Sequence, residues 1–281
     1  MIKNILCATD GSPHGDTACS YAFDLAKRLD ARLELVHVVD VRLLDLQTMP
    51  TTVGFLGGWG AKATEGFRNA LQTRGQEVLD AAAKRAAAQG LPVETTLEFG
   101  NPAQTLVDIE DRMELVVVGR QGEHAESSPG MTGSTMERYI RRSDRPVLVT
   151  PGEFKPVSRI LVAVDGSPPS WRALHEAIEL ANPLEAPLLI LSIAEGKGEE
   201  EQARSLAESA HASARAHNCA AAPFVGKGTP GEQILAGAAA HGADLLVLGA
   251  HGRLGKVYER MIGLTAAHLA SQAPLPVLLV P

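Results

Sequence analysis

Two glycine-rich turns of this chain have residue types and spacing that suit phosphate binding. In the first half, Gly119 and Gly122 are followed, after ten intervening residues, by Gly133, Ser134 and Thr135. Glycine lets a backbone approach a phosphate closely, and a helix N-terminus presents free N–H groups with a favourable dipole. The glycine pair follows a strand-like run and precedes a helix that opens with Gly-Ser-Thr, so the context predicts an anion site.

The second half repeats this turn with altered chemistry. Its matching residues are Gly249, Gly252, Gly263 and Thr265. Leu264 replaces the first hydroxyl, whereas His251 lies between the first two glycines, in a loop from which it could reach a ligand. The loop that follows carries cations where the first half has acidic side chains: Arg253, Lys256 and Arg260 against Glu123 and Glu126. The two sites are therefore predicted to be unequal.

An aspartate follows the first strand-like run of each half, at Asp10 and Asp165. In an open α/β sheet a ligand binds beyond the carboxyl ends of the strands. A carboxylate there could accept hydrogen bonds from a ribose hydroxyl or an adenine amine. Asp-Gly is also a turn signal, so the alternative is that each aspartate only begins its turn. The repetition of the aspartate favours ligand binding.

Several other motifs that carry chemistry are missing from the sequence. It has no GxxxxGK[ST], GxSxG or HExxH run, and its nine histidines do not gather at metal-ligand spacings. We therefore expect no P-loop and no metal held by protein side chains, and we assign no catalytic residue. His37, which lies within a strand-like run, is interpreted as structural.

The elements that must position these residues occur twice. ILCATDGS at 5–12 recurs as ILVAVDGS at 160–167, an offset of 155. ELVVVGRQG at 114–122 recurs as DLLVLGAHG at 244–252, an offset of 130. One unit was thus duplicated with a change of length in its middle. We predict two domains and a linker, at 1–151, 159–281 and 152–158 respectively.

Most of the length difference is a Gly-rich segment at 41–62 that the second unit lacks. Two interpretations stay open for it: a flap beside the site, or an ordinary surface insertion.

Strand-like and helix-like runs alternate in each unit. Strands are expected at 3–9, 33–39, 93–98, 114–119 and 146–150, and again at 159–164, 187–193, 221–225, 244–249 and 276–280. Helices of the first unit are expected near 13–29, 63–89, 102–111 and 134–143. Four residues are expected to cap helices because a proline follows each: Ser12, Asn101, Ser167 and Thr229. The alternation predicts an α/β fold of two tandem, open, five-stranded parallel sheets with helices on both faces, as in Rossmann-like proteins.

The overall composition and net charge argue against several classes of function. The 281 residues are 45% apolar and 21% charged, as in soluble globular proteins, and the net charge of −7 argues against a nucleic-acid partner. No apolar run reaches the roughly 20 residues that a membrane span needs, and the first residues read directly into a strand. We expect no membrane association and a cytoplasmic location. Cys7, Cys19 and Cys219 form no CxxC pair and are expected to be buried thiols.

These motifs resemble those of the universal stress protein family: a strand ending in aspartate, a second strand reading LVHVVD, and a late Gly-x-x-Gly loop leading to Gly-Ser. The resemblance covers nearly the whole chain, in tandem form. It implies a five-stranded parallel sheet in each unit and ATP or AMP at the motif residues. It also implies that the last strands, PVLVT and PVLLV, pair as an internal pseudo-dimer. Both units have ten residues where the family usually has nine before the final glycine.

Carried over by position, the resemblance implies a nucleotide site in each unit. In the first unit the site residues are Thr9, Asp10, Val38, Gly119, Gly122, Gly133, Ser134 and Thr135. In the second they are Val164, Asp165, Ile193, Gly249, Gly252, Gly263 and Thr265, joined by His251 from the loop.

Three hypotheses for function follow. The leading one is a stress-response module that binds ATP, ADP or AMP, with or without Mg²⁺, and changes its partner contacts with occupancy; a homodimer of the whole chain stays open. The second is a slow Mg²⁺-dependent ATP hydrolase that uses Glu123, His124 or Glu126 as base. The third is an interaction scaffold without a ligand, suggested by the longer loops and by Leu264.

Overall fold

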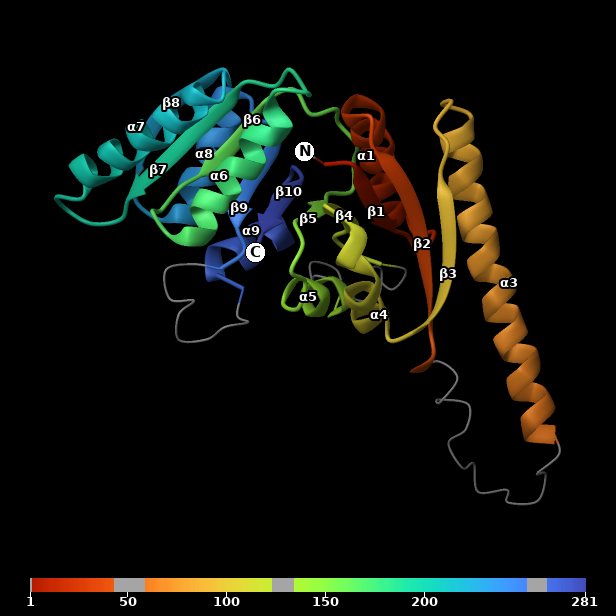
Figure 1. Cartoon of the computed structure of the whole chain (residues 1–281). Coiled ribbons are helices and arrows are strands. Elements are labelled where there is room, and N and C mark those ends of the chain that lie inside the picture. The colour runs from red at the N-terminus through yellow and green to blue at the C-terminus, as the bar shows by residue number, and fades with distance from the viewer. Residues whose placement is uncertain (1, 43–58, 123–133, 252–261) are drawn as a thin grey trace, which may run out of the picture.

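Ten strands form one continuous sheet with helices on both faces (Figure 1). The computed structural model describes residues 2–42, 59–122, 134–251 and 262–281, with the backbone alone at 59–64 and 134. Within these ranges, no helix has both the length and the apolar character that crossing a bilayer requires.

The elements of unit 1, which precedes residue 152, follow the predicted alternation. They are β1 (Asn4–Ala8), α1 (Pro13–Leu29), β2 (Arg32–Asp40), α3 (Trp59–Ala87), β3 (Glu94–Gly100), α4 (Pro102–Ile109), β4 (Leu115–Gly119), α5 (Ser134–Ile140) and β5 (Val147–Thr150). A short 3₁₀ turn, Glu110–Arg112, extends α4. The Gly-rich segment is described only at its two ends, because residues 43–58 lie outside the described ranges.

Unit 2, which begins at residue 159, repeats this order. Its elements are β6 (Ile160–Ala163), α6 (Pro168–Ala181), β7 (Leu188–Ala194), α7 (Glu200–Ala216), β8 (Ala221–Lys227), α8 (Pro230–His241), β9 (Leu245–Gly249), α9 (Leu264–Gln272) and β10 (Val277–Val280). All ten predicted strands are confirmed to within about two residues at each boundary.

The strand order is β3-β2-β1-β4-β5-β10-β9-β6-β7-β8. Neighbouring strands within each unit are parallel, and the one antiparallel pair, β5 with β10, joins the units. Leu148 lies opposite Leu278 and Val149 opposite Val277, and all four are buried. The expected pairing of the last strands is therefore present within one chain, and it fuses the two predicted five-stranded sheets into one.

Each face of the sheet has its own hydrophobic layer, and each layer crosses the boundary between the units. One contains side chains of α1, α3, α6 and α7, and the other contains side chains of α4, α5, α8 and α9. Alternate residues of a strand enter opposite layers: Ile5 and Cys7 enter the first, Leu6 the second. Burial on both faces explains why the strands are nearly continuous apolar runs.

Three of the four predicted helix caps are present. Ser12 accepts from the Gly15 amide, Ser167 from the Ser170 amide and Asn101 from the Gln104 amide. Thr229 is the N-cap residue of α8, as predicted, but the expectation that its side chain makes the capping bond was wrong. The helix still begins there because Pro230 presets the first φ and the Thr229 carbonyl accepts the Gln233 amide at 3.0 Å.

The three cysteines are buried, as predicted. Cys7 lies in β1 and Cys19 in α1. Cys219 lies two residues before the first residue of β8, Ala221.

The same carboxylate contact fixes the start of the first strand in each unit. Glu114 accepts the amides of Lys3 and Asn4 at 3.2 and 2.6 Å, and Asp244 accepts those of Ser158 and Arg159, both at 2.9 Å. Each carboxylate comes just before the fourth strand of its unit. The contact therefore sets the register of the two central strands, on which the candidate sites depend.

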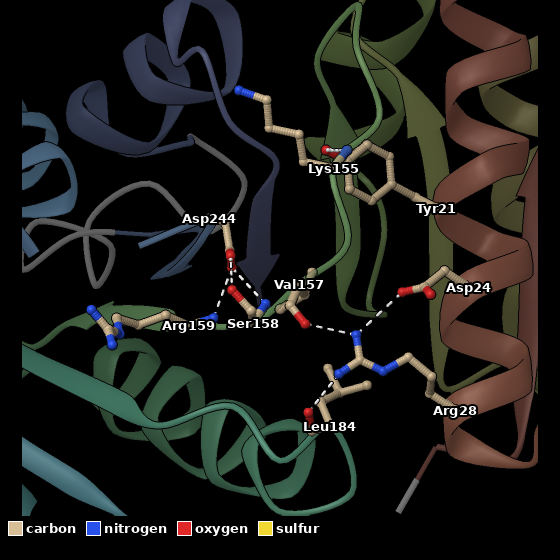
Figure 2. Close-up of polar contacts among 9 residues, drawn as sticks. All are labelled: Tyr21, Asp24, Arg28, Lys155, Val157, Ser158, Arg159, Leu184 and Asp244. Carbon is tan, nitrogen blue, oxygen red and sulfur yellow. Dashed lines mark hydrogen bonds and ion pairs between the residues drawn. The ribbon is translucent and has the colours of Figure 1, made fainter. Parts of the chain in front are cut away.

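Side chains of α1 hold the segment that connects the units (Figure 2). The Tyr21 hydroxyl donates to the Glu153 carbonyl at 3.3 Å and accepts the Lys155 amide at 3.2 Å. The Arg28 guanidinium donates to the Val157 carbonyl at 2.6 Å and to the Leu184 carbonyl of unit 2 at 2.5 Å. One side chain thus ties α1, the connecting segment and unit 2 together.

We expect Arg28→Ala to lower the free energy of unfolding by about 1–3 kcal/mol, because two buried carbonyls lose a charged donor. Urea unfolding followed by circular dichroism would measure the loss. Arg112→Ala, at an exposed arginine, is the control and should change stability by less than about 0.5 kcal/mol. Equal stability of the two variants would show that the Arg28 contacts do not hold the units together.

Candidate functional site

The first strand and the fourth strand of each unit, which the described candidate residues follow, are neighbours that lead to helices on opposite faces of the sheet. In unit 1 these strands are β1 and β4, and in unit 2 they are β6 and β9. Chain crossovers leave the sheet in opposite directions from such a pair, which opens a crevice beyond the carboxyl ends of the strands. Thr9 and Asp10 follow β1, and Gly119 to Gly122 follow β4.

The carboxylate of Asp10 lies between the two loops. Its Oδ1 accepts the Ser12 amide at 3.0 Å. A Cβ atom at Gly122 would lie 2.8 Å from Oδ2, and one at Gly15 would lie 2.8 Å from Oδ1. Asp10 and Gly122, 112 residues apart in sequence, therefore lie close together. Neither Gly15 nor Gly122 could carry a larger side chain without displacing the Asp10 carboxylate.

Asp165 makes the same local turn in unit 2, where its Oδ1 accepts the Ser167 amide at 2.9 Å. Both aspartates thus begin their turns, as the structural interpretation expected. The hydrogen bond within the turn uses one acceptor site of Oδ1 in each aspartate. The geometry is therefore compatible with ligand binding by the same carboxylate.

The first glycine of each loop has a packing reason. A Cβ atom at Gly119 would lie 2.9 Å from the backbone carbonyl of His14, and one at Gly249 would lie 2.8 Å from Pro169. The first turn of α1 or α6 therefore presses on the end of the neighbouring strand. These glycines let helix and strand approach closely whether or not a phosphate binds.

The end of β2 faces this crevice with its backbone. Thr9 donates its amide to the Val36 carbonyl at 2.9 Å, so Val36 directs its peptide groups toward β1. Val38, two residues on, directs its N–H and carbonyl to the same side, past the last residue of β1. The Val164 amide likewise bonds to Leu191 at 2.8 Å, which orients Ile193 in the same way.

His37 has the structural role that the sequence analysis gave it. Its Nδ1 lies 2.9 Å from the Thr9 carbonyl oxygen. Its ring packs against α3 at Gly75, where a Cβ atom would lie 2.8 Å from His37 Cδ2. Gly75 thus allows α3 to cover the ring. The contact holds Thr9, a predicted site residue, at the end of β1.

Helix α9 starts beside its glycine loop. Gly263 is the N-cap of α9 and donates its amide to the Ala250 carbonyl at 2.9 Å. The Leu264 side chain is 91% exposed, and Thr265 is half-buried. His251 is also half-buried. The N-terminus of α9 therefore adjoins the end of β9, as the anion-site hypothesis requires.

In unit 1, Ser134 begins α5 and Thr135 is half-buried on it. The predicted residues Gly133 and Gly252 lie outside the described ranges, as do the hydrolase candidates Glu123, His124 and Glu126 and the cations Arg253, Lys256 and Arg260. Among the described residues, no group of His, Cys, Asp and Glu side chains is arranged to hold a metal ion.

Comparisons with known proteins give the same family for both units. A model of the universal stress protein family matches residues 1–151 and 156–281. The chain belongs to the universal stress protein family. The universal stress protein Slr1230 of Synechocystis is 26% identical over 99% of each chain, and one from Mycolicibacterium smegmatis is 27% identical over 98% of this chain and 96% of its own. A universal stress protein structure from Archaeoglobus fulgidus matches 99% of this chain and 97% of its own, with a TM-score of 0.74 at 20% identity.

One contact that the sequence did not predict anchors α5 in the first universal stress protein unit. Glu110, 2% exposed, accepts hydrogen bonds from the Tyr139 hydroxyl, from Ser143 Oγ at 2.7 Å and from the Asp144 amide at 2.9 Å. Burial and the neighbouring Glu110 charge raise the pKa of Tyr139, so the phenol stays a donor. The carboxylate thereby fixes the C-terminal part of the helix that opens at Ser134.

A second unpredicted contact crosses between the units. Arg120, from the first glycine loop, donates from Nη2 to the Ala273 carbonyl at 2.5 Å and from Nη1 to the Ser271 carbonyl at 3.4 Å. Those carbonyls end α9, where a cation is favoured by the helix dipole. Partial burial lowers the pKa of Arg120. Arg120 thus turns away from the first crevice and caps the helix that opens at the second.

We expect Glu110→Gln to lower the free energy of unfolding by about 2–4 kcal/mol, since an amide nitrogen replaces one acceptor of a buried, fully bonded carboxylate. Asp111→Asn, at the neighbouring exposed carboxylate, should stay within about 0.5 kcal/mol of the parent. Guanidinium unfolding of the two variants and the parent measures the difference. Similar midpoints for both substitutions would mean that the Glu110 cluster does not anchor α5.

We expect Arg120→Met to speed amide hydrogen exchange in the last turn of α9 while the exchange of α5 stays unchanged. Methionine preserves much of the packing but donates no hydrogen bond to Ser271 or Ala273. Arg138→Met, at an exposed arginine of α5, is the matched control. Exchange in α9 at the parent rate would contradict the capping role.

Proposed function

We propose that this universal stress protein is a regulatory module that binds an adenine nucleotide in the crevice between β1 and β4 of unit 1, and that occupancy alters its contacts with partners. The observation that carries the proposal is the approach of Asp10 and Gly122, which joins the turn after β1 to the glycine loop after β4. A carboxylate suited to a ribose hydroxyl thus borders a loop suited to phosphate.

The backbone at the end of β2 supports the adenine end of this proposal. The N–H and carbonyl of Val38 are directed past the last residue of β1, toward the turn that holds Asp10. One donor and one acceptor at fixed spacing can pair with the edge of an adenine ring. Base, ribose and phosphate would then lie in that order along one line from β2 through β1 to β4.

Unit 2 has the same framework with fewer polar groups, so we propose that it binds nucleotide more weakly. Val164 replaces Thr9, and an exposed Leu264 replaces Ser134 at the start of the helix. The N–H groups of α9 and the Thr265 hydroxyl stay available to an anion in this proposal. The proposed domains are 1–151 and 159–281, joined by 152–158.

Identification of bound nucleotide is the first test. Freshly purified protein would be denatured, and the released small molecules identified and quantified by mass spectrometry. We expect about one adenine nucleotide per chain, in line with one strong site. Protein that releases none, and that shows no thermal shift with ATP, ADP or AMP, would contradict nucleotide binding and favour the scaffold hypothesis.

A matched pair of substitutions assigns the site. We expect Asp10→Asn to weaken nucleotide binding roughly 10-fold, or about 1.4 kcal/mol, because the amide keeps the turn acceptor but removes the charge that strengthens a bond to ribose. Asp165→Asn makes the same change in the same turn of unit 2, and we expect affinity within about twofold of the parent. Titration calorimetry measures both, and an effect confined to Asp165→Asn would assign the site to unit 2.

A further inference from the structure

Two thiols face each other beneath the first crevice. The sulfur atoms of Cys7 on β1 and Cys19 on α1 are 3.8 Å apart, and both side chains are fully buried. A disulfide has an S–S length of roughly 2.05 Å, so closure requires the two sulfur atoms to approach by roughly 2 Å, through side-chain rotation together with a shift of α1 toward β1. The nucleotide proposal makes no use of either cysteine.

The surroundings of the pair make the two thiols chemically different. The hydrogen bond with Cys7, helped by a bond with Thr9 and by the nearby Arg85 charge, lowers the pKa of Cys19 against the effect of burial. The same contact, together with burial, raises the pKa of Cys7. A thiolate is the nucleophile in thiol oxidation, so one sulfur is suited to attack first and the other to resolve the product.

The third cysteine is an internal reference. Cys219 is buried in unit 2, before β8, and its sulfur contacts the Ala220 carbonyl at 3.8 Å. Burial raises its pKa, and no thiol partner for it is found in the described part of the chain. Any reaction that depends only on a buried thiol should treat Cys219 like the other two.

We propose that Cys7 and Cys19 form a redox-active dithiol that a hydroperoxide converts into an intramolecular disulfide. Cys19 thiolate attacks a peroxide oxygen, the O–O bond breaks, and Cys19 becomes a sulfenic acid as water or an alcohol leaves. The Cys7 sulfur then attacks the Cys19 sulfur, the S–O bond breaks, and hydroxide leaves as water with the Cys7 proton. Two thiols lose two electrons, and the peroxide gains them.

Access for the oxidant lies along the contact between α1 and α3. Arg85 of α3 pairs with Asp16 of α1 at 2.8 Å, and both side chains are partly exposed. Asp16 precedes Cys19 by three residues on α1, so the ion pair lies on the same side of that helix as the Cys19 thiol. Opening of that contact admits a small peroxide, and the reaction is therefore slower than at an exposed thiol.

Closure of the disulfide would act on the candidate nucleotide site. Cys7 precedes Thr9 by two residues, and Cys19 follows Gly15 by one turn of α1. A Cβ atom at Gly15 would already lie 2.9 Å from Thr9 Oγ1 and 2.8 Å from Asp10 Oδ1, so α1 cannot approach β1 without moving these residues. This effect on nucleotide affinity rests on the proposed function, whereas the disulfide itself does not.

The test uses the full chain under native conditions. Reduced protein is treated with hydrogen peroxide, the remaining thiols are alkylated, and the unreduced digest is analysed by mass spectrometry. We expect two of the three thiols to be lost. A cross-linked peptide pair that carries Cys7 and Cys19 and is two hydrogens lighter should appear, and a reductant should restore both thiols.

Two variants control the assignment. Cys219→Ser should still lose two thiols, and Cys19→Ala, a small apolar replacement that suits a buried site, should form no disulfide. The peroxide dose is set so that it fully oxidises the thiols of the urea-unfolded chain. If the native chain still has three alkylated thiols after that dose, or forms a disulfide through Cys219, the proposal is wrong. Disulfide formation in a chain that binds no nucleotide would support the dithiol and contradict the proposed function alone.

Discussion

The antiparallel pairing of β5 with β10 is the contact on which the rest of the structure depends. Each unit ends in a short apolar strand whose outer edge would expose unpaired peptide groups. Pairing of β5 with β10, with Leu148 opposite Leu278, covers both strand edges and joins the two units into a single ten-stranded sheet. The hydrophobic layers on its two faces then run across both units, so neither unit has a core closed off from the other. Arg28 and Tyr21 add polar contacts that hold the connecting segment against this seam (Figure 2).

The fold was predictable because its signals are local and repeated. The ten strands of the sheet are located by apolar runs of four to nine residues, by proline after a capping residue and by the two sequence offsets. Because the unit is duplicated, each element is predicted twice, independently. The exception is instructive: Thr229 has the right residue type before Pro230 but makes no cap bond, because the proline and the backbone carbonyl suffice to start α8. Residue type thus located the helix start correctly and gave the wrong cause.

The site was predictable only as a set of positions. The sequence indicates that Asp10 and Gly122 each follow a strand of the same sheet. It does not show that Gly122 lies against the Asp10 carboxylate, or that Gly119 leaves room for the first turn of α1. Glu110 and Arg120 were missed for a related reason. A buried carboxylate and an exposed one look alike in sequence, and the partners of Arg120 lie 151 and 153 residues away, across a seam that exists only after the units pair.

Divergence of the two units explains why their candidate sites are tied together. Helix α5 is held from within its own unit by Glu110, through Tyr139 and Ser143. The corresponding positions of unit 2, at the offset of 130, are Leu269 and Ala273, which cannot bond to a carboxylate through their side chains. The C-terminus of α9 is instead capped by Arg120, a residue of the first glycine loop, while Ala250 at the matching position of unit 2 has no side-chain donor to make the reciprocal contact. Among the described contacts, the C-terminus of α9 is therefore held by a side chain of unit 1, whereas the C-terminal part of α5 is held by a side chain of its own unit.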